Sequence, residues 1–301
     1  MSHPFQHPAM RGLIAQVAHV FKSAEARLTV DRHLLFLCGG SDDASLRKQF
    51  LTYAAAELQP FRVFLAEAAA KDITDFGPPT FINLSQFEQF IADFSDCIVI
   101  FLESPGAFAE IGLFTNVPTI RDKLLVIIAY QTTNSFINYG PIAEVNSTSI
   151  LRPVIYLDPG VTPINFAPIR ERLITIFSTK YRRRFNFDSY NVLKPIARLG
   201  IVLVIVQLFS PISFDDIFMI IESIFDNTNV EEVKHLIALT VAVGYVRRVG
   251  DLGDLFFIEP GTKPLLEFPK SDEIQRIRIS VISLYREYFA ELYDLLGTSA
   301  S

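Results

Sequence analysis

The sequence predicts an α/β protein with a doubly wound parallel sheet, followed by a C-terminal winged helix-turn-helix domain. Apolar segments of strand length alternate with helical patterns through the first half of the chain, which is typical of βαβ units. Several of these strands end in glycine or acidic residues, at the positions where open parallel sheets bind ligands. The second half contains three helical patterns and a two-stranded ribbon. We expect one domain over residues 1–180 and a second over 181–301.

The composition is that of a folded protein with a large core. The chain has 301 residues, of which 50% are hydrophobic and 12% aromatic, enough for one large or two ordinary domains. The net charge of −6 excludes a generally basic protein that coats nucleic acid, so any such contact would be a local patch.

The two cysteines, Cys38 and Cys97, lie in apolar runs without a histidine cluster. This pattern indicates neither a metal site nor a disulfide framework and favours a reducing compartment. The start of the chain has no apolar signal core, and the longest apolar runs fall short of the ~20 residues that span a bilayer. We therefore expect a cytoplasmic protein that does not contact membranes.

The predicted elements of the first half begin with a helix within residues 10–30, expected to pack outside the sheet that follows. Leu34–Cys38 is an apolar strand, and Ala44–Leu58 has helical spacing. The alternation continues with a strand at Arg62–Leu65, a helix at 80–95, a strand at Cys97–Leu102, a helix at Ala107–Phe114 and a strand at Lys123–Ala129. Such alternation predicts parallel strands with right-handed helical crossovers.

Three of the predicted strands end in residues suited to binding. Gly39 and Gly40 follow the first strand and permit a tight turn and close approach of a ligand. They form neither a GxGxxG fingerprint nor a phosphate loop of NTPases, and a plain strand-to-helix turn explains them equally well. Glu67 and Glu103 follow the second and third strands. All three strand ends would meet at one edge of the sheet.

Glu110 is the most distinctive residue of this half, because it is the only charged residue between Glu103 and Arg121. The preceding turn contributes Ser104 and Gly106 at a helix start, where free N–H groups favour anions. Helical spacing places Glu110 on a face with apolar residues rather than in a solvated stripe. The helix dipole alone favours such a carboxylate by roughly 0.3–1 kcal/mol. Its isolation among apolar neighbours favours a functional role.

The segment Ser135–Pro141 follows the fourth strand and is predicted to be a loop with a Gly-Pro turn. Asn138 would be able to bind a sugar hydroxyl and Tyr139 to stack on a base. Ordinary turn chemistry explains both residues as well.

A short strand at Val154–Leu157 and a helix from about Ile169 follow, and the helix is closed by Arg182, Arg183 and Arg184. This most basic spot of the chain fits a phosphate-contacting patch, a partner contact or a solvated helix end. The solvated end is slightly favoured, because it faces the C-terminal helix dipole.

The second half predicts helices at Val192–Phe209, Ser213–Phe225 and Val230–Val243, then a ribbon of Tyr245–Val249 and Leu255–Glu259. Three helices and a hairpin are the order of a winged helix-turn-helix, whose third helix enters the major groove in DNA-binding members. A last helix, Asp272–Leu296, has one apolar side suited to packing or oligomerisation.

The charges of the third helix in this pattern do not favour binding in the major groove of DNA. It offers Lys234 and His235 against two glutamates. Arg247 and Arg248 of the ribbon are better candidates for nucleic-acid contact. A winged helix used for protein contacts fits equally well.

Three motifs resemble a known family. They are Leu35-Phe36-Leu37-Cys38-Gly39-Gly40, then Glu103-Ser104-Pro105-Gly106-Ala107-Phe108-Ala109-Glu110-Ile111-Gly112, and Ser135-Phe136-Ile137-Asn138-Tyr139-Gly140-Pro141. In this order they look like the retron effectors related to nucleoside 2-deoxyribosyltransferases, which join a deoxyribosyltransferase-like domain to a winged helix. The motifs cover the N-terminal half, and the C-terminal half is similar only by its order of elements.

The resemblance implies roles for individual residues. In deoxyribosyltransferases the glutamate of the Glu-Ile/Leu-Gly motif attacks the anomeric carbon of the sugar and expels the base, and Glu110 matches it. Glu103 matches the acidic residue that helps to hold the substrate. We expect Glu110 to be catalytic and the substrate to be bound by Cys38, Gly39, Gly40, Glu67, Glu103, Ser104, Gly106, Asn138 and Tyr139.

The resemblance also implies partners. Similar retron effectors act on nucleotides, NAD included, and a complex of reverse transcriptase and msDNA holds them inactive until phage infection. We therefore expect a toxic antiviral N-glycosidase of NAD or a related nucleotide, without cofactor or metal. The expected partners are the reverse transcriptase, the msDNA with its non-coding RNA and further copies of the chain, because the family's transferases build active sites between subunits.

The chemistry is consistent with these residues. Cleavage of an N-glycosidic bond passes through an oxocarbenium-like state that a carboxylate stabilises or captures. Neighbouring carboxylates would raise the pKa of one of them. The second domain and the Ile137-Asn138-Tyr139-Gly140 form depart from ordinary transferases, so the substrate and the acceptor of the sugar stay open. The alternatives are a metabolic nucleoside 2-deoxyribosyltransferase or nucleotide N-glycosidase, and a nucleotide-sensing winged-helix DNA-binding regulator.

Overall fold

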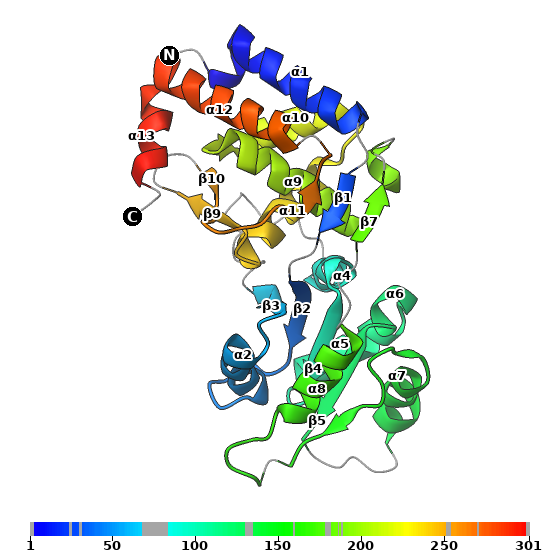
Figure 1. Ribbon diagram of the computed structural model, residues 1–301. Coiled ribbons are helices and arrows are strands. Elements are labelled where there is room, and N and C mark those ends of the chain that lie inside the picture. Colours follow the sequence, from blue (N-terminus) through cyan, green and yellow to red (C-terminus); the bar gives the residue numbers. More distant parts are fainter. Residues whose placement is uncertain are drawn as a thin grey trace. The chain divides into compact units, whose positions relative to one another are not determined.

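The chain forms two compact units in the computed structural model, which describes residues 3–23, 26–29, 32–67, 84–129, 135–158, 160–177, 182–185, 187, 189–250, 254–269 and 271–298. Residues 31–180 make up the α/β unit, and residues 1–30 with 181–301 make up the terminal unit (Figure 1). The sequence predicts residues 1–30 as part of the first domain. They belong instead to the terminal unit, because their helix and strand both find partners there.

The α/β unit is built on one parallel sheet, as the sequence predicts, and its five strands lie in the order β3-β2-β4-β5-β6. The strands are β2 His33–Cys38, β3 Phe61–Phe64, β4 Cys97–Phe101, β5 Leu124–Ile128 and β6 Ile155–Tyr156. The direction of winding reverses between β2 and β4. In open α/β sheets the crevice outside the carboxyl ends of such a strand pair is the usual ligand site.

Helices cover both faces of this sheet, because successive strand residues point to opposite faces. Leu35 and Leu37 pack in a core with residues of α2 and α8, whereas the Phe36 ring packs against Phe114 of α5. Helix α4 contacts β2 and α5. The helices of this unit are α2 Leu46–Glu57, α4 Leu84–Phe94, α5 Pro105–Thr115, α6 Pro118–Arg121, η2 Asn138–Ile142, α7 Ala143–Thr148 and α8 Ala167–Ile176. Residues 80–83 of the helix predicted at 80–95 lie outside the described residues.

The prediction of a loop at Ser135–Pro141 is wrong in one respect. Residues Asn138–Ile142 form a π-helix that continues into α7. Pro141 lies inside this helix. Because proline has no N–H, the ordinary α-helical hydrogen bond is missing there, and a wider turn accommodates the residue.

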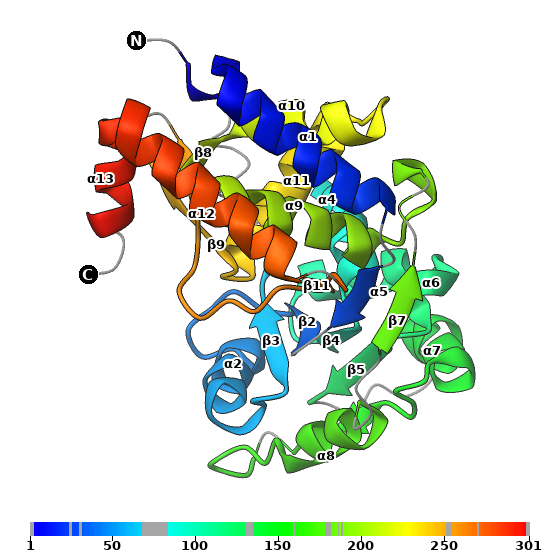
Figure 2. The same ribbon diagram turned by 45° about the horizontal axis from the view of Figure 1, so that its top comes forward.

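The terminal unit is helical with two small sheets. Helix α9 is buried along most of its length and contacts α10, α11 and α12 (Figure 2). The other elements are η1 Pro4–Gln6, α1 Pro8–Ser23, η3 Tyr190–Val192, α9 Pro195–Phe209, α10 Phe214–Phe225, α11 Val230–Ala242, α12 Ser271–Tyr288 and α13 Ala290–Thr298. The sheets are β11-β1-β7 and β8-β10-β9, from β1 Ala26–Thr29, β7 Arg182–Phe185, β8 Ile212–Ser213, β9 Val246–Val249, β10 Leu255–Ile258 and β11 Leu266–Glu267.

Two predictions for this unit are wrong. The basic cluster does not close a helix: α8 ends at Ile176, and Arg182–Phe185 is strand β7, paired antiparallel with β1. Pairing with a strand near the start of the chain overrides local preference and has no local signature. The last helix is also interrupted, at Phe289, where His7 packs against the neighbouring ring of Tyr288 at 4.7 Å between ring centroids.

Lys180 and Tyr181 lie outside the described residues, as do the side chains of Arg182, Arg183 and Arg184 and the ribbon residues 251–253. No helix in the described part of the chain combines the length and the apolar character needed to cross a membrane.

Candidate active site

Five side chains from five elements gather at the carboxyl edge of the sheet, around the point where the strand order reverses. Cys38 ends β2, Arg47 lies in the first turn of α2 and Glu67 follows β3. Glu88 comes from α4 and Glu110 from α5. The charges of Arg47, Glu67 and Glu88 and the thiol of Cys38 all act on the Glu110 carboxyl group.

Glu110 is the most perturbed carboxyl group of this cluster. Burial, together with the charges of Glu88 and Glu67, raises the pKa of Glu110 to about 7, against the opposing effects of the Arg47 charge and the Cys38 thiol. Its buried Oε2 atom has no hydrogen-bond partner among the described residues. A carboxyl group that ionises near neutral pH and keeps one oxygen free is suited to act as a nucleophile or an acid–base group.

Glu88 is a site residue that the sequence prediction missed. Burial raises its pKa, and the Glu67 charge raises it too. Within Leu84–Ala92 it is the only charged residue, which is the same signal that singled out Glu110. The site therefore holds two carboxyl groups with raised pKa values on neighbouring helices.

Arg47 was also missed. Its side chain is buried, and its Nη1 atom lies 2.6 Å from Oε1 of the more exposed Glu67. With the three glutamates ionised, the cluster carries −3 from Glu67, Glu88 and Glu110 and +1 from Arg47, or −2 in total. Such a site disfavours an anion and favours a positive or neutral reacting group.

Glu103, expected to hold the substrate, is engaged by the protein backbone. Its Oε1 accepts hydrogen bonds from the N–H groups of Gly40 and Arg47, both at 3.0 Å, and its Oε2 accepts one from Leu46 at 2.6 Å. The start of a helix after a strand is a common site for phosphate. Here the carboxylate of the chain itself occupies that position.

The two glycines after β2 leave room for the Glu103 side chain to approach the backbone. Gly39 has φ 148°, and a Cβ atom there would lie 3.0 Å from Arg47 Cβ and 3.1 Å from Glu103 Oε1. A Cβ at Gly40 would lie 3.3 Å from the Glu103 carboxyl carbon. The group that approaches these glycines closely is therefore Glu103.

The remaining predicted residues of the first two motifs lie around α5 and β2. Ser104 caps α5, since its Oγ accepts a hydrogen bond from the Ala107 N–H at 3.2 Å. Gly106 is exposed in the first turn of that helix. Cys38 is 3% exposed, and its thiol lowers the pKa of the nearby Glu110 carboxyl group. Of the predicted residues, the structure thus brings Cys38, Glu67 and Glu110 together.

Tyr139 lies beside a different face of α5. Tyr139 is 74% exposed and lines a pocket of about 760 Å³ together with Gly112 of α5. Gly112 is two residues beyond Glu110, or about 200° around the helix axis. Asn138 accepts a hydrogen bond from Ser135 Oγ at 2.5 Å. Within one chain the Tyr139 ring therefore does not lie on the Glu110 side of α5.

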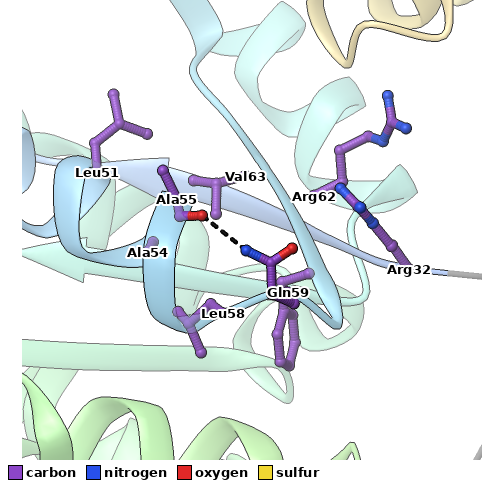
Figure 3. Close-up of a pocket in the computed structure, with 9 residues that line it drawn as sticks. Arg32, Leu51, Ala54, Ala55, Leu58, Gln59, Arg62 and Val63 are labelled. Carbon is purple, nitrogen blue, oxygen red and sulfur yellow. Dashed lines mark hydrogen bonds between the residues drawn. The ribbon is translucent and has the colours of Figure 1, made fainter.

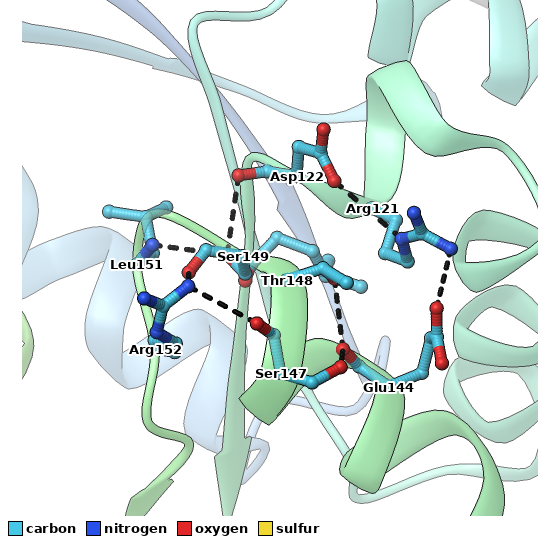
Figure 4. A network of polar contacts seen from close by, with 9 residues as sticks. Arg121, Asp122, Glu144, Ser147, Thr148, Ser149, Leu151 and Arg152 are labelled. Carbon is cyan, nitrogen blue, oxygen red and sulfur yellow. Dashed lines mark hydrogen bonds and ion pairs between the residues drawn. The ribbon is translucent and has the colours of Figure 1, made fainter.

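A polar network fixes the helix that follows this segment (Figure 4). Arg121 Nη1 lies 2.6 Å from Glu144 Oε1, and the Thr148 hydroxyl donates to the Glu144 carbonyl at 2.9 Å. The Ser149 hydroxyl donates to the Leu124 carbonyl at 2.8 Å, which ties the end of α7 to β5. These contacts hold α7 in place and leave the Tyr139 ring exposed beside it.

Residues 43–248 match the family described as STM3845 retron effector protein. The match covers more than half of the chain. The chain belongs to the STM3845 retron effector family.

Two curated relatives of this effector come from Escherichia coli. It is 33% identical over 144 residues to a protein of retron Ec86 named as a candidate ribosyltransferase/DNA-binding protein, covering 45% of this chain and 46% of the relative. It is 29% identical over 124 residues to the protein of the same description from retron Ec73, covering 39% of each chain. The matches thus span less than half the length of either relative.

A second pocket in the α/β unit of this retron effector lies at the opposite edge of the sheet. It measures about 360 Å³ and is lined by Arg32, before β2, and by Arg62, at the start of β3 (Figure 3). Gln59 closes one side, its amide donating to the Ala55 carbonyl at 2.9 Å. This pocket is at the amino ends of strands whose carboxyl ends carry Cys38 and Glu67, so it is separate from the Glu110 cluster.

The arginines of the effector's ribbon are engaged within that ribbon. Arg248 Nη2 lies 2.8 Å from Asp254 Oδ1, and the Arg247 guanidinium lies 5.4 Å from the ring centroid of Phe257. Three charged residues of α11 are engaged as well, in the pairs Glu232–Arg198 at 2.6 Å and Lys234–Glu231 at 2.9 Å.

Proposed function

We propose that this retron effector cleaves the N-glycosidic bond of NAD or a related nucleotide, with Glu110 as the nucleophile. The observation that carries the proposal is the buried Glu110 carboxyl group, with a pKa raised to about 7 and an oxygen without a described partner. The names of the two retron relatives, which include a ribosyltransferase activity, support the same class of reaction.

In the first step the ionised Glu110 attacks the anomeric carbon, and the electrons of the C–N bond leave with the base. Glu88, whose pKa is raised, gives a neutral leaving base its proton. A nicotinamide that carries a positive charge leaves without that proton. In the second step Glu88 is ionised, either because it has given its proton to a neutral base or because it was ionised throughout when nicotinamide leaves. It takes a proton from water, and the resulting hydroxide attacks the anomeric carbon, which releases the sugar and restores Glu110.

The charge of the cluster supports a positively charged reacting group. Glu67, Glu88 and Glu110 with Arg47 add up to −2 when all are ionised. An oxocarbenium-like transition state gains positive charge at the sugar, and fixed negative charges stabilise it. The pyridinium of NAD fits the same potential.

We further propose that the terminal unit contains a winged helix. The chain order of α9, β8, α10, α11, β9 and β10, with the sheet order β8-β10-β9, supports this. The internal ion pairs of α11 favour protein contacts over reading of the major groove. Reverse transcriptase and msDNA are the proposed inhibitory partners, and the effector is a proposed homo-oligomer in which Asn138 and Tyr139 serve a neighbouring copy.

The test is to incubate the purified protein with NAD and with deoxynucleosides and to measure free nicotinamide or base. Wild type should release nicotinamide, and Glu110→Gln should lower the rate at least about 10³-fold. The matched control is Glu144→Gln, since Glu144 pairs with Arg121 and lies beside another face of α5. Base exchange between deoxynucleosides would instead indicate a metabolic transferase, and inactivity of wild type on every substrate would favour a nucleotide-sensing regulator.

A cellular arm tests the role as a toxic effector. Expression of wild type without its retron partners should arrest bacterial growth, and Glu110→Ala should relieve the arrest. Growth inhibition that persists with Glu110→Ala would contradict the glycosidase as the source of toxicity.

A further inference from the structure

The pocket at the amino ends of β2 and β3 has two walls of different character. Its volume of about 360 Å³ lies in the range of pockets that hold small molecules. One wall is apolar and comes from the last turns of α2, where the small side chains of Ala54 and Ala55 leave the hollow open. The other wall carries Arg32 and Arg62 (Figure 3). The pocket thus joins an apolar surface to a positively charged one.

The pocket reaches around the outer edge of the sheet. Strand β3 is the edge strand next to β2 in the part of the chain that the structure describes. Successive residues of a strand point to opposite faces, yet Phe61, Arg62 and Val63 all line the pocket. The hollow is therefore open to both faces at this edge. Helix α2, which packs on the Phe61 face, and Arg62, which lies on the other face, can contribute to one site in this way.

The two arginines give the walls of the pocket a charge of +2. Arg32 is exposed and Arg62 is half-buried, and none of the described residues that line the pocket is acidic. The Glu110 cluster at the other end of the same strands carries −2 when its three glutamates and Arg47 are ionised. The two ends of the sheet therefore favour opposite charges. Guanidinium groups bind phosphate through paired hydrogen bonds, so a phosphate group suits this wall.

Gln59 adds a hydrogen-bonding group beside the apolar wall. Its amide nitrogen donates to the Ala55 carbonyl at 2.9 Å, which fixes the side chain across the end of α2. The amide oxygen points away from that carbonyl and is an acceptor (Figure 3). An apolar surface beside a fixed amide matches the face and the polar edge of a nucleobase.

We infer that this pocket is a second nucleotide site, which binds the phosphate of a mononucleotide with Arg32 and Arg62 and its base against the last turns of α2. The site is distinct from the Glu110 cluster, because the six residues of β2 separate the two by roughly 16–20 Å. The inference does not depend on the proposed function, since no residue of the Glu110 cluster takes part in this binding.

The first test is calorimetric titration of the full chain with AMP, adenosine and inorganic phosphate. Wild type should bind AMP more tightly than either of its two parts. Arg32→Gln and Arg62→Gln should each weaken AMP binding at least about tenfold. The matched control is Arg152→Gln, which removes the same charge beside β6 at the far edge of the sheet and should change the affinity less than about twofold. Equal losses in the control and the two variants would overturn the inference, as would wild type that does not bind AMP.

Glu110→Gln distinguishes the two ends of the sheet in the same titration. AMP binding that persists in this variant and is lost in the arginine variants supports the pocket at the amino edge. Binding that is lost in Glu110→Gln and retained in both arginine variants would place the nucleotide at the carboxyl edge and contradict the inference. These outcomes do not involve nicotinamide release, so failure of the glycosidase and failure of the second site are separate results.

A second test closes the pocket without changing a charge. Ala55→Leu extends the α2 wall into the hollow and should weaken AMP binding at least about fivefold. Ala56→Leu is the matched control, since Ala56 is exposed on the same helix and does not line the pocket. Leucine is a good helix former, so both variants should unfold at nearly the wild-type temperature. AMP affinity that is unchanged in Ala55→Leu would contradict binding against α2.

Discussion

The backbone N–H of Arg47 donates a hydrogen bond to the Glu103 carboxylate at 3.0 Å, while its guanidinium group lies 2.6 Å from the carboxylate of Glu67. Arg47 thus joins the end of β4 to the segment that follows β3. Two acidic residues that look alike in the sequence have different roles as a result. Glu103 stabilises the loop after β2 by accepting hydrogen bonds from its backbone, and Glu67 belongs to the Glu110 cluster.

Removal of the Glu103 carboxylate should destabilise the protein. Glu103→Ala leaves three backbone N–H groups without their charged acceptor, so we expect a loss of about 2–4 kcal/mol in the free energy of unfolding, measured in urea. The control is Glu57→Ala, whose exposed carboxylate lies 3.7 Å from Arg170 and should matter by less than about 1 kcal/mol. Equal losses in the two variants would show that Glu103 is an ordinary surface residue.

A methyl group at Gly39 should be far more costly than one at Gly112. Gly39 has φ 148°, and its Cβ would meet atoms of Arg47, Glu103 and Phe101 within 3.0–3.2 Å. We expect Gly39→Ala to cost roughly 2–4 kcal/mol in thermal or urea unfolding. A Cβ at helical Gly112 meets nothing within 4 Å, so Gly112→Ala should be neutral or stabilising by up to about 1 kcal/mol.

Neutralising Glu110 should stabilise the fold, and only at higher pH. The folded state binds this proton more tightly than the unfolded chain, because the pKa is raised to about 7. Stability is therefore lost as the pH rises from the unfolded pKa through the folded one. Glu110→Gln should be roughly 1–3 kcal/mol more stable than wild type at pH 8 and about equal to it at pH 5. A gain of the same size at both pH values would contradict the raised pKa.

The two partners of one ion pair should move the pH profile in opposite directions. Glu67 raises the pKa of Glu110 and Arg47 lowers it. The acid limb of kcat/KM for nicotinamide release should therefore shift to lower pH in Glu67→Gln and to higher pH in Arg47→Gln. Shifts in the same direction would mean that loss of the ion pair, and not the charge at Glu110, controls the profile.

Much of the α/β unit follows from local pattern. Strand β4 is an apolar run bounded by a charge and a turn, and the alternation of strands and helices predicts its parallel neighbours. Glu110 could be predicted from the sequence because a single charged residue in an otherwise apolar helix is unfavourable unless it has a function. Glu88 shows the same signal, but it lies in a helix with a strongly apolar side, and packing of that side explains the helix without a functional residue. Arg47 has no such signal, since a basic residue in the first turn of a helix is normally solvated.

The features that could not be predicted depend on distant partners. Only the paired strand β1 explains why Arg182–Phe185 is extended. The commitment of Glu103 to the loop after β2 joins residues more than fifty positions apart, so no local pattern shows it. The π-helix at Asn138 depends on how the chain accommodates Pro141, and a Gly-Pro pair by itself signals a turn.

The pairing of β1 with β7 makes the α/β unit an insertion into a hairpin. Thr29 and Arg182 face each other across this antiparallel pair, so their Cα atoms are only ~4.5–5.5 Å apart. The chain leaves the terminal unit at one position and returns beside it, and a short turn in place of residues 30–181 would close the hairpin. Any signal that passes along the chain from the terminal unit to Glu110 must travel through these two adjacent strands.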